Sequence, residues 1–220
     1  MIVIDSSQKQ LDQAIAHSKR PNIEYRCEDI GDGLSMEDDS VDLVTVAQGL
    51  HWFDIPRLIA EIRRILKVDG LCAVMGYSTP RFDQYERFQE EFGKYYVRTL
   101  GSYNYGSTDP KKPCYWNIDR KLIDFAFEDE SLFIGEDRFE QSSFERTFVF
   151  DNKFLTEQEL FGYFQSMSGY QTYMDAHGLQ HWDEGDPMVH LRDVYRDDMQ
   201  RYDQSKMMVI YPFFLLTMKK

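Results

Sequence analysis

The segment from Val41 to Ala47 constrains the fold of this chain more than any other. It is almost wholly apolar, as expected of a strand that is buried on both faces of a sheet. Such strands are typical of parallel sheets, whose connections run through helices packed on the sheet faces. Apolar residues at helical spacing follow, then Asp69-Gly70 as a stop signal, then a second apolar run over 71–77. We therefore predict an α/β fold with a mostly parallel sheet.

Strand and helix signals alternate along the rest of the first half. Ile2–Asp5 and 23–27 read as strands, and Ser7-x-x-Gln10 between them resembles a capping box that begins a helix. The second half is rich in aromatic residues. Its periodicity predicts helices over 82–100, 115–129, 156–167 and 187–202, and strands over 143–151 and 206–217 that suit an antiparallel sheet edge. We interpret residues 1–220 as one domain with a helical insertion over approximately 82–142.

Composition argues against several classes of function. A net charge of -13 over 220 residues repels phosphate backbones and anionic lipids, so we expect neither a nucleic-acid nor a membrane partner. The three cysteines lack metal-ligand spacing and read as reduced thiols of an intracellular protein. The longest apolar run, 209–218, contains Pro212 and is too short to span a bilayer. We predict a soluble, cytoplasmic protein, whose oligomeric state the sequence does not fix.

Polar and aromatic residues follow the predicted strands at their carboxyl ends, where open parallel sheets bind ligands. A carboxylate there can accept hydrogen bonds from both hydroxyls of a ribose, and an Asp beside an apolar Ile suits an adenine ring. The residues in question are Asp5 after the first strand, Asp29 and Ile30 after the second, Gln48, His51 and Trp52 after the third, and Tyr77 at the end of the fourth.

Several of these residues, and Trp116 in the second half, also have a structural interpretation. Asp5 suits the capping region of the helix that follows it. Asp29 sits in an acidic loop, where carboxylates are usually solvated. A lone histidine is more often a half-buried structural residue, but the place of His51 beside Trp52 at a strand end balances the two interpretations. Trp116 and the other aromatic residues of the second half fit a core better than a pocket.

His177-x-x-x-His181, followed by Asp183 and Glu184, has the spacing of a metal-ligand pair on a helix. Gly178 lies inside the motif and weakens the helix, and no third ligand is clearly placed. We therefore predict no metal site.

Several segments together resemble the class I S-adenosylmethionine-dependent methyltransferases, and in particular the branch that includes trans-aconitate methyltransferase. The most specific is Ala47-Gln48-Gly49-Leu50-His51-Trp52-Phe53-Asp54. The others are Ile4-Asp5-Ser6-Ser7, Glu24-Tyr25-Arg26, Ser40-Val41-Asp42-Leu43-Val44 and the run from Glu61 to Gly70. Tyr115-Trp116 and Ser166-Met167-Ser168-Gly169-Tyr170 resemble the helical substrate cover of that branch.

The resemblance implies a Rossmann-like methyltransferase sheet, mostly parallel with an antiparallel edge, a helical substrate cover, and S-adenosyl-L-methionine as the cofactor. The roles it implies are ribose binding for Asp5, adenine binding for Asp29 and Ile30, a place beside the methionine moiety for Gln48, catalysis for His51, and acceptor binding for Trp52, Tyr77 and Trp116.

The implied reaction is methyl transfer to a small-molecule acceptor, with a carboxylate as one candidate. Such a displacement needs the nucleophile and the sulfonium methyl group held in line, and an ionised carboxylate needs no strong base. His51 becomes a base only for a hydroxyl or amine acceptor. The alternative function is that of a catalytically inactive methyltransferase-fold remnant that acts through protein–protein binding.

The glycine-rich loop that carries the family's main cofactor contact is absent, together with its strand. A strand, turn and helix would need about 30 residues before Met1. We therefore interpret the chain as N-terminally incomplete, with doubtful activity and weak or no cofactor binding. In this fold the missing strand belongs between Ile2–Asp5 and Val41–Ala47. Because two open rows of backbone groups are costly, we expect these two strands to close directly on each other.

Overall fold

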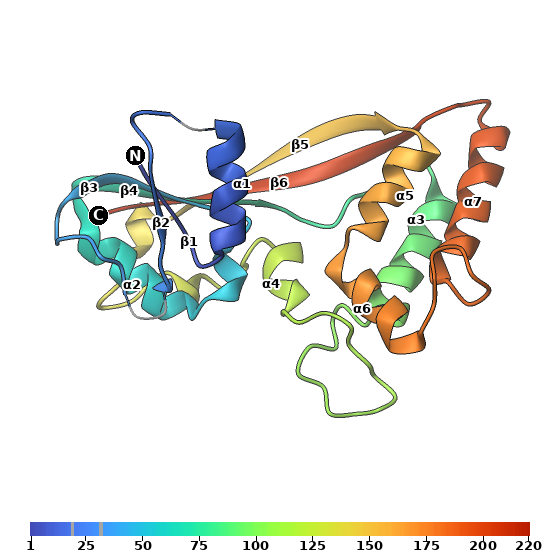
Figure 1. Ribbon diagram of the computed structural model, residues 1–220, viewed down its shortest axis with the longest axis horizontal. Helices are drawn as coiled ribbons and strands as arrows, with labels where there is room; N and C mark the ends of the chain where they lie inside the picture. The colour runs from blue at the N-terminus through green and yellow to red at the C-terminus, as the bar shows by residue number, and fades with distance from the viewer. Residues whose placement is uncertain (19, 31–32) are drawn as a thin grey trace. The chain divides into compact units, whose positions relative to one another are not determined.

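The computed structural model describes residues 1–18, 20–30 and 33–220 (Figure 1). The chain divides into two compact units. The first comprises Met1–Ala73, Ser131–Phe144 and Thr217–Lys220, and the second comprises Val74–Glu130 and Glu145–Leu216. The single domain with an insertion over 82–142 stays a prediction. Within the described residues, no helix is both long and apolar enough to cross a membrane.

The first unit begins with a strand, helix and strand: β1 (Ile2–Asp5), α1 (Gln8–Ser18) and β2 (Glu24–Cys27). β1 and β2 pair in parallel, with Ile2 opposite Glu24 and Asp5 opposite Cys27. The helical crossover between two adjacent parallel strands confirms the predicted order of elements. Leu11 is the buried residue of α1 and anchors it.

A second strand and helix follow in the same unit: β3 (Val41–Ala47), the short 3-10 helix η2 (Leu50–Trp52), α2 (Ile55–Ile65) and β4 (Leu66–Tyr77). The Asp54 side chain accepts a hydrogen bond from the Arg57 backbone N–H at 3.3 Å and so caps α2, and Pro56 suits the first turn of a helix. The buried residues of α2 recur at the spacing of one helix face: Ile55, Leu58, Ile59, Ile62 and Ile65.

The sheets differ from the predicted arrangement. β3 and β4 join β6 (Met207–Lys219) and β5 (Glu145–Leu155) in a four-stranded sheet of order β3-β4-β6-β5, whereas β1 and β2 form a two-stranded sheet of their own. The expected closure of β1 on β3 is therefore wrong for the described part of the chain. A four-residue β1 offers few ladder hydrogen bonds to offset the ordering that a second pairing requires. β3 is consequently an outer strand, and Leu43 is exposed rather than buried.

The second unit holds most of the helices: α3 (Glu86–Gly93), the π-helical segment η3 (Lys94–Thr99), α4 (Arg120–Asp124), α5 (Glu157–Gln165), α6 (Ser168–His177) and α7 (Pro187–Arg201). Their shared core is aromatic. Phe82 lies edge-on to Phe88 with ring centroids 4.8 Å apart, and Phe92 stacks on Phe164 at 5.0 Å. The dense aromatic residues of the second half therefore build a core, as predicted.

The helix predicted over 115–129 is wrong over most of its length, because only Arg120–Asp124 is α-helical. Ala126 and Phe127 have positive φ angles of 50° and 52°, which end the helix. The Phe127 carbonyl accepts a hydrogen bond from the Arg146 guanidinium at 2.8 Å, and its ring lies 5.8 Å from that of Phe214. These tertiary contacts outweigh the local helical periodicity.

Candidate active site

The carboxyl ends of β1 and β2 bring part of the predicted cofactor site together. Asp5 is half-buried and faces Cys27, two residues before Asp29, and the Glu28 backbone N–H donates to the Asp5 carbonyl at 3.3 Å. Asp29 is exposed and Ile30 is half-buried. The residues predicted for ribose and adenine thus lie at the same end of one parallel strand pair.

Asp5 also contributes to the start of α1, as its structural interpretation predicted. Its Oδ1 accepts a hydrogen bond from the Ser7 backbone N–H at 2.7 Å. Ser7 in turn accepts from the Gln10 backbone N–H through Oγ at 3.4 Å. A carboxylate has about four acceptor positions, so one bond to the helix start leaves capacity for a diol. The capping and ligand-binding interpretations of Asp5 are therefore compatible.

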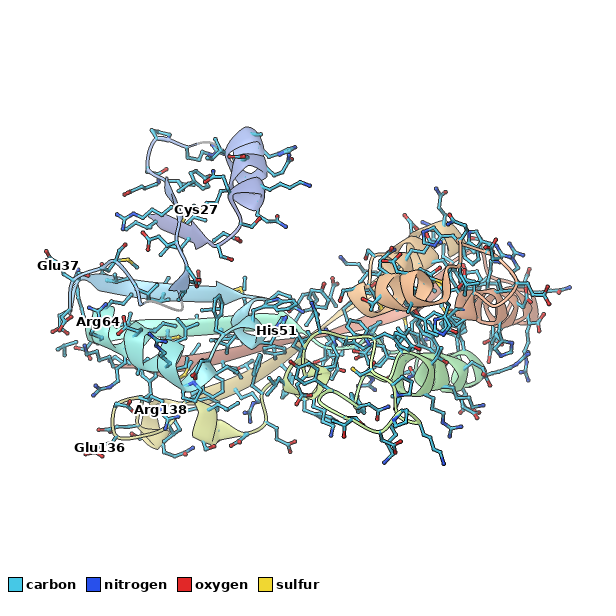
Figure 2. All side chains as sticks on the ribbon, turned by 60° about the horizontal axis from the view of Figure 1, so that its bottom comes forward. Cys27, Glu37, His51, Arg64, Glu136 and Arg138 are labelled. Carbon is cyan, nitrogen blue, oxygen red and sulfur yellow. The ribbon has the colours of Figure 1, made fainter. Side chains whose placement is uncertain are left out.

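The residues that follow β3, also in the first unit, bring two aromatic side chains next to each other. Gln48 has a φ of 50°, a left-handed conformation that is uncommon for a residue with a side chain. The His51 and Trp52 rings follow in η2, with centroids 5.1 Å apart, and Trp52 is 56% exposed. Figure 2 labels the position of His51. Gln48, His51 and Trp52 thus follow one another closely after the carboxyl end of β3.

Tyr77 and Trp116 lie in the second unit. Tyr77 ends β4, and its ring centroid lies 5.8 Å from that of Phe213. Trp116 is buried in the aromatic core, 5.6 Å from the Tyr96 ring and against Gly169 of α6. The two segments that resemble a substrate cover therefore touch each other, through Trp116 and Gly169.

A buried polar cluster follows the end of β4 and was not predicted. Arg120 and Asp124 form an ion pair at 3.0 Å, and the Tyr96 hydroxyl accepts from Arg120 at 2.7 Å and donates to Asp124 at 2.9 Å. The Thr79 hydroxyl also donates to Asp124, at 2.7 Å. Burial, reinforced by the Asp124 charge, raises the pKa of Tyr96. The sequence signal was an opposite-charge pair four residues apart beside apolar residues.

Arg120 also covers the aromatic residues of this cluster. Its guanidinium lies 4.7 Å from the Trp116 ring centroid and 5.8 Å from that of Tyr96, a cation–π arrangement. The predicted acceptor-binding residue Trp116 is thereby tied to a charged network rather than to apolar neighbours alone.

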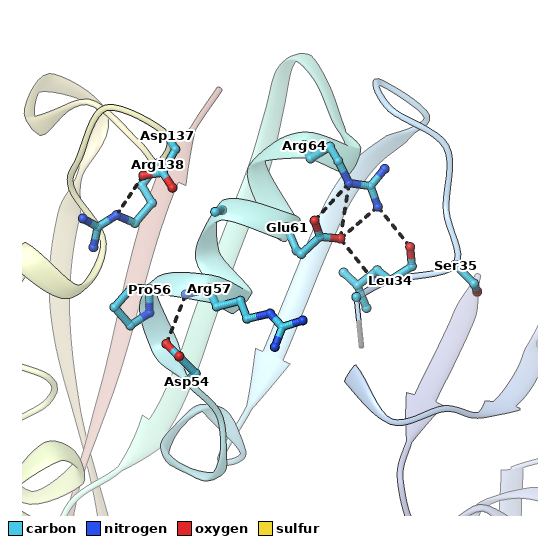
Figure 3. A pocket seen from close by; sticks show the side chains of 11 residues that line it. Leu34, Ser35, Asp54, Pro56, Arg57, Glu61, Arg64, Asp137 and Arg138 are labelled. Carbon is cyan, nitrogen blue, oxygen red and sulfur yellow. Dashed lines mark hydrogen bonds and ion pairs between the residues drawn. The ribbon is translucent and has the colours of Figure 1, made fainter. Parts of the chain in front are cut away.

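The first unit also has an open hollow of about 840 Å³ over α2 (Figure 3). Figure 3 shows Arg64 reaching Glu61 and the Leu34 carbonyl. The hydrogen bond from Arg64 lowers the pKa of Glu61. None of the predicted site residues is among the described residues that line this hollow, which are Gly33, Leu34, Ser35, Asp54, Pro56, Arg57, Ala60, Glu61, Arg64, Asp137 and Arg138.

The histidine pair considered for metal binding is divided by the end of a helix. Gly178 is left-handed, with a φ of 65°, and caps α6 directly after His177. His181 lies beyond it, where its Nδ1 is 2.9 Å from the Tyr170 hydroxyl, which donates to Asp186 at 3.1 Å. Over the described ranges, the structure holds no group of three or more His, Cys, Asp or Glu side chains suited to a metal ion.

Comparisons with known proteins find similarity to methyltransferases, and the match to a family model lies in the first part of the chain. Residues 1–74 match the methyltransferase domain family. A methyltransferase of Dictyostelium discoideum is 30% identical over 176 residues, which cover 80% of this chain and 59% of that protein. An S-adenosylmethionine-dependent methyltransferase of Saccharomyces cerevisiae is 29% identical over 91 residues, 41% of this chain and 28% of the relative. The chain thus spans less than two thirds of the length of these relatives.

A solved structure supports the fold over the whole chain. A methyltransferase from Anaeromyxobacter dehalogenans superposes with a TM-score of 0.72 at 19% identity, covering 99% of this chain and 79% of that one. The predicted Rossmann-like methyltransferase fold is therefore confirmed. Residues 1–74 thus match the methyltransferase domain family, and the chain has the fold of the class I S-adenosylmethionine-dependent methyltransferases.

Proposed function

We propose that this chain functions in methyl transfer from S-adenosylmethionine to a small-molecule acceptor. The observation that carries the proposal is the parallel register of β1 and β2, which sets the Asp5 carboxylate at the same strand ends as Asp29 and Ile30. Ligands of open α/β sheets bind at such strand ends.

The residues at these strand ends fit the nucleoside half of the cofactor. The half-buried Asp5 carboxylate suits the two ribose hydroxyls, since a carboxylate only accepts hydrogen bonds and a diol supplies two donors. Asp29 suits the exocyclic amine of adenine, and half-buried Ile30 suits one face of the ring. The Gln48 amide would lie beside the methionine moiety. When bound, the cofactor supplies an electrophilic methyl group.

The residues after β3 suit the acceptor. A carboxylate acceptor reacts in its ionised form, so His51 would only orient it, whereas a hydroxyl acceptor needs His51 to take its proton. Trp52 offers an exposed ring against which an acceptor can pack. For Tyr77 and Trp116, acceptor binding stays the role that the family resemblance implies.

A titration of S-adenosylhomocysteine, followed by calorimetry, tests the proposal without depending on activity. We expect weak, saturable binding, and a loss of about 10-fold or more in affinity for Asp5→Ala, because hydrogen bonds to a charged group contribute about 1.5–3 kcal/mol. Asp12→Ala is the matched control, since Asp12 is exposed on α1 and should leave the affinity unchanged. No binding by the unaltered chain, or equal affinities of Asp5→Ala and Asp12→Ala, would refute the proposal.

A second candidate function is protein–protein binding by the fold itself. It is favoured by the position of β3 as an outer strand with an exposed Leu43, because such strands are templates for pairing with another chain. The same titration separates the two functions. A folded chain that binds no S-adenosylhomocysteine favours the second.

A further inference from the structure

β5 is the outer strand at the other side of the four-stranded sheet, next to β6. Its residues 147–154 are all exposed, and they include Phe148 (51% exposed), Val149 (59%), Phe150 (55%) and Phe154 (59%). Proteins usually protect an outer strand with charges, proline or a bulge. Thr147-Phe148-Val149-Phe150 has no charge or proline and consists of strong β-formers. An exposed strand of this kind is a surface for strand pairing.

We propose that β5 pairs antiparallel with β5 of a second copy of this chain, about a two-fold axis at Val149. The pairing would continue the four-stranded sheet of one copy into that of the other. Two-fold symmetric interfaces of this type bring one surface patch onto itself, so the strand must be complementary to its own reverse.

The sequence of β5 meets this requirement. With the axis at Val149, Phe148 faces Phe150 of the second copy, and the reciprocal pair places four phenylalanine rings on one face. On the other face of the paired strands, Glu145 faces Lys153 and Thr147 faces Asp151, which gives a charge pair and a hydroxyl–carboxylate pair. Cross-strand pairs of these types stabilise antiparallel sheets.

Two other positions of the axis are disfavoured by like charges. An axis at Phe148 sets Glu145 against Asp151, and an axis at Asp151 sets that carboxylate against its own copy. Like charges directly opposite each other destabilise a strand pair. Axes at Phe150 and Asn152 oppose no like charges, but the first forms no opposite-charge pair and the second pairs only residues 149–155 of the strand. The axis at Val149 combines opposite-charge pairs with a longer paired segment, 145–153, and is therefore the register that we propose.

The ion pair that β5 forms within its own chain does not prevent this pairing. Lys153 Nζ lies 3.5 Å from Asp151 Oδ2 within the chain, but both side chains are about half exposed, so this pair contributes little and can be shared. β5 carries two acidic and two basic residues, Glu145, Asp151, Arg146 and Lys153. The paired surface is thus locally neutral, although the whole chain has a charge of -13.

Sedimentation equilibrium of the full chain over a range of micromolar concentrations tests the association. We expect a reversible dimer at twice the chain mass of 26.1 kDa. Val149→Lys places two like charges at the axis and should give a monomer with an unchanged circular dichroism spectrum. Val68→Lys is the matched control, because Val68 is an exposed strand valine of β4 and its substitution should leave the dimer intact.

Charge reversal tests the register. Glu145→Lys and Lys153→Glu should each raise the dimer dissociation constant about tenfold, since each spoils two symmetric pairs. The double variant restores opposite charges and should return close to the unaltered constant. If Glu145 and Lys153 do not face each other across the interface, the double variant should not recover the dissociation constant of the unaltered chain.

Disulfide cross-linking gives a second, independent measure of the register. Val149→Cys brings the two new thiols directly opposite each other, whereas Thr147→Cys leaves them four residues out of register, roughly 13 Å apart along the strands. With Cys27 replaced by serine throughout, because its thiol is exposed, we expect a cross-linked dimer for Val149→Cys and none for Thr147→Cys or the parent chain. A monomer at all concentrations, a dimer that persists in Val149→Lys, or equal cross-linking of both cysteine variants would overturn the proposal.

Discussion

Trp116 lies so close to Gly169 that a Cβ on the glycine would overlap the indole ring. This contact joins two segments more than fifty residues apart in the sequence, and it explains why α6 has a glycine next to its first residue. A side chain at this position must displace either the buried indole or the helix.

Gly169→Ala should therefore destabilise the chain by about 1–3 kcal/mol, the usual cost of overpacking a core. Gly162→Ala is the matched control, because Gly162 is also helical but a Cβ added to it would meet no neighbouring atom within 4 Å. It should raise stability by about 0.5–1 kcal/mol through lower entropy of the unfolded chain. Urea unfolding measures both, and equal effects would contradict the packing argument.

Asp124→Ala should cost about 3–5 kcal/mol, because it leaves the Arg120 guanidinium buried without its carboxylate partner. The comparison is Asp42→Ala, which breaks the exposed pair between Asp42 and Lys67 and should cost about 1 kcal/mol or less. Thermal and urea unfolding provide the measurement. A small effect of Asp124→Ala would mean that water reaches Arg120.

Asp198, on α7, should make the free energy of unfolding of the chain depend on pH. Its carboxyl is buried, and burial raises its pKa, against the lowering effect of Arg87 and Arg201. A raised pKa in the folded state means that the favourable contribution is complete below the unfolded value of about 3.9 and is lost as pH rises through the folded value.

Asp198→Asn removes this titration, so its stability relative to the unaltered chain should increase as pH rises above about 4. Asp193→Asn, an exposed change on the same helix, should show no such trend. Urea unfolding between pH 4 and 7 provides the data. A relative stability of Asp198→Asn that stays constant with pH would show that the carboxyl is not perturbed.

The cysteines should differ sharply in reactivity. Cys72 is fully buried and burial raises its pKa to about 12, whereas Cys27 is exposed. Because the thiolate is the reactive form, iodoacetamide at pH 8 should modify Cys27 and spare Cys72 until the chain unfolds. Mass spectrometry of peptides reports the two sites, and equal rates in the native chain would show that β4 opens readily.

The sequence predicted best those helices that begin with a capping residue or a proline. α7 begins at Pro187 after the capping residue Asp186, as the sequence indicates, and ends one residue before the predicted limit. α5 begins after Thr156, whose capping box with Glu159 is complete. In such helices the boundary depends on neighbours in the sequence, so the sequence is sufficient.

Long-range contacts set the features that the sequence did not predict. The short length of α4 depends on the hydrogen bond from Arg146 to the Phe127 carbonyl, and the separation of β1 from β3 depends on which strand pairs form. The same contrast between local and long-range contacts applies to the candidate site. The grouping of Asp5, Asp29 and Ile30 follows from one crossover, whereas the network around Arg120 joins residues from distant segments.

The two-stranded β1–β2 sheet has a thermodynamic consequence for any ligand held at Asp5. Two strands alone are marginally stable in water, and within α1, all of which the structure describes, only Leu11 is buried. Amide hydrogens of this strand–helix–strand segment should therefore exchange with solvent through local opening, at a lower free energy than those of α7. A ligand that binds only when this segment is folded has an affinity lowered in proportion to the fraction of molecules in which the segment is folded. Protection of these amides from exchange should therefore rise as the ligand site is occupied.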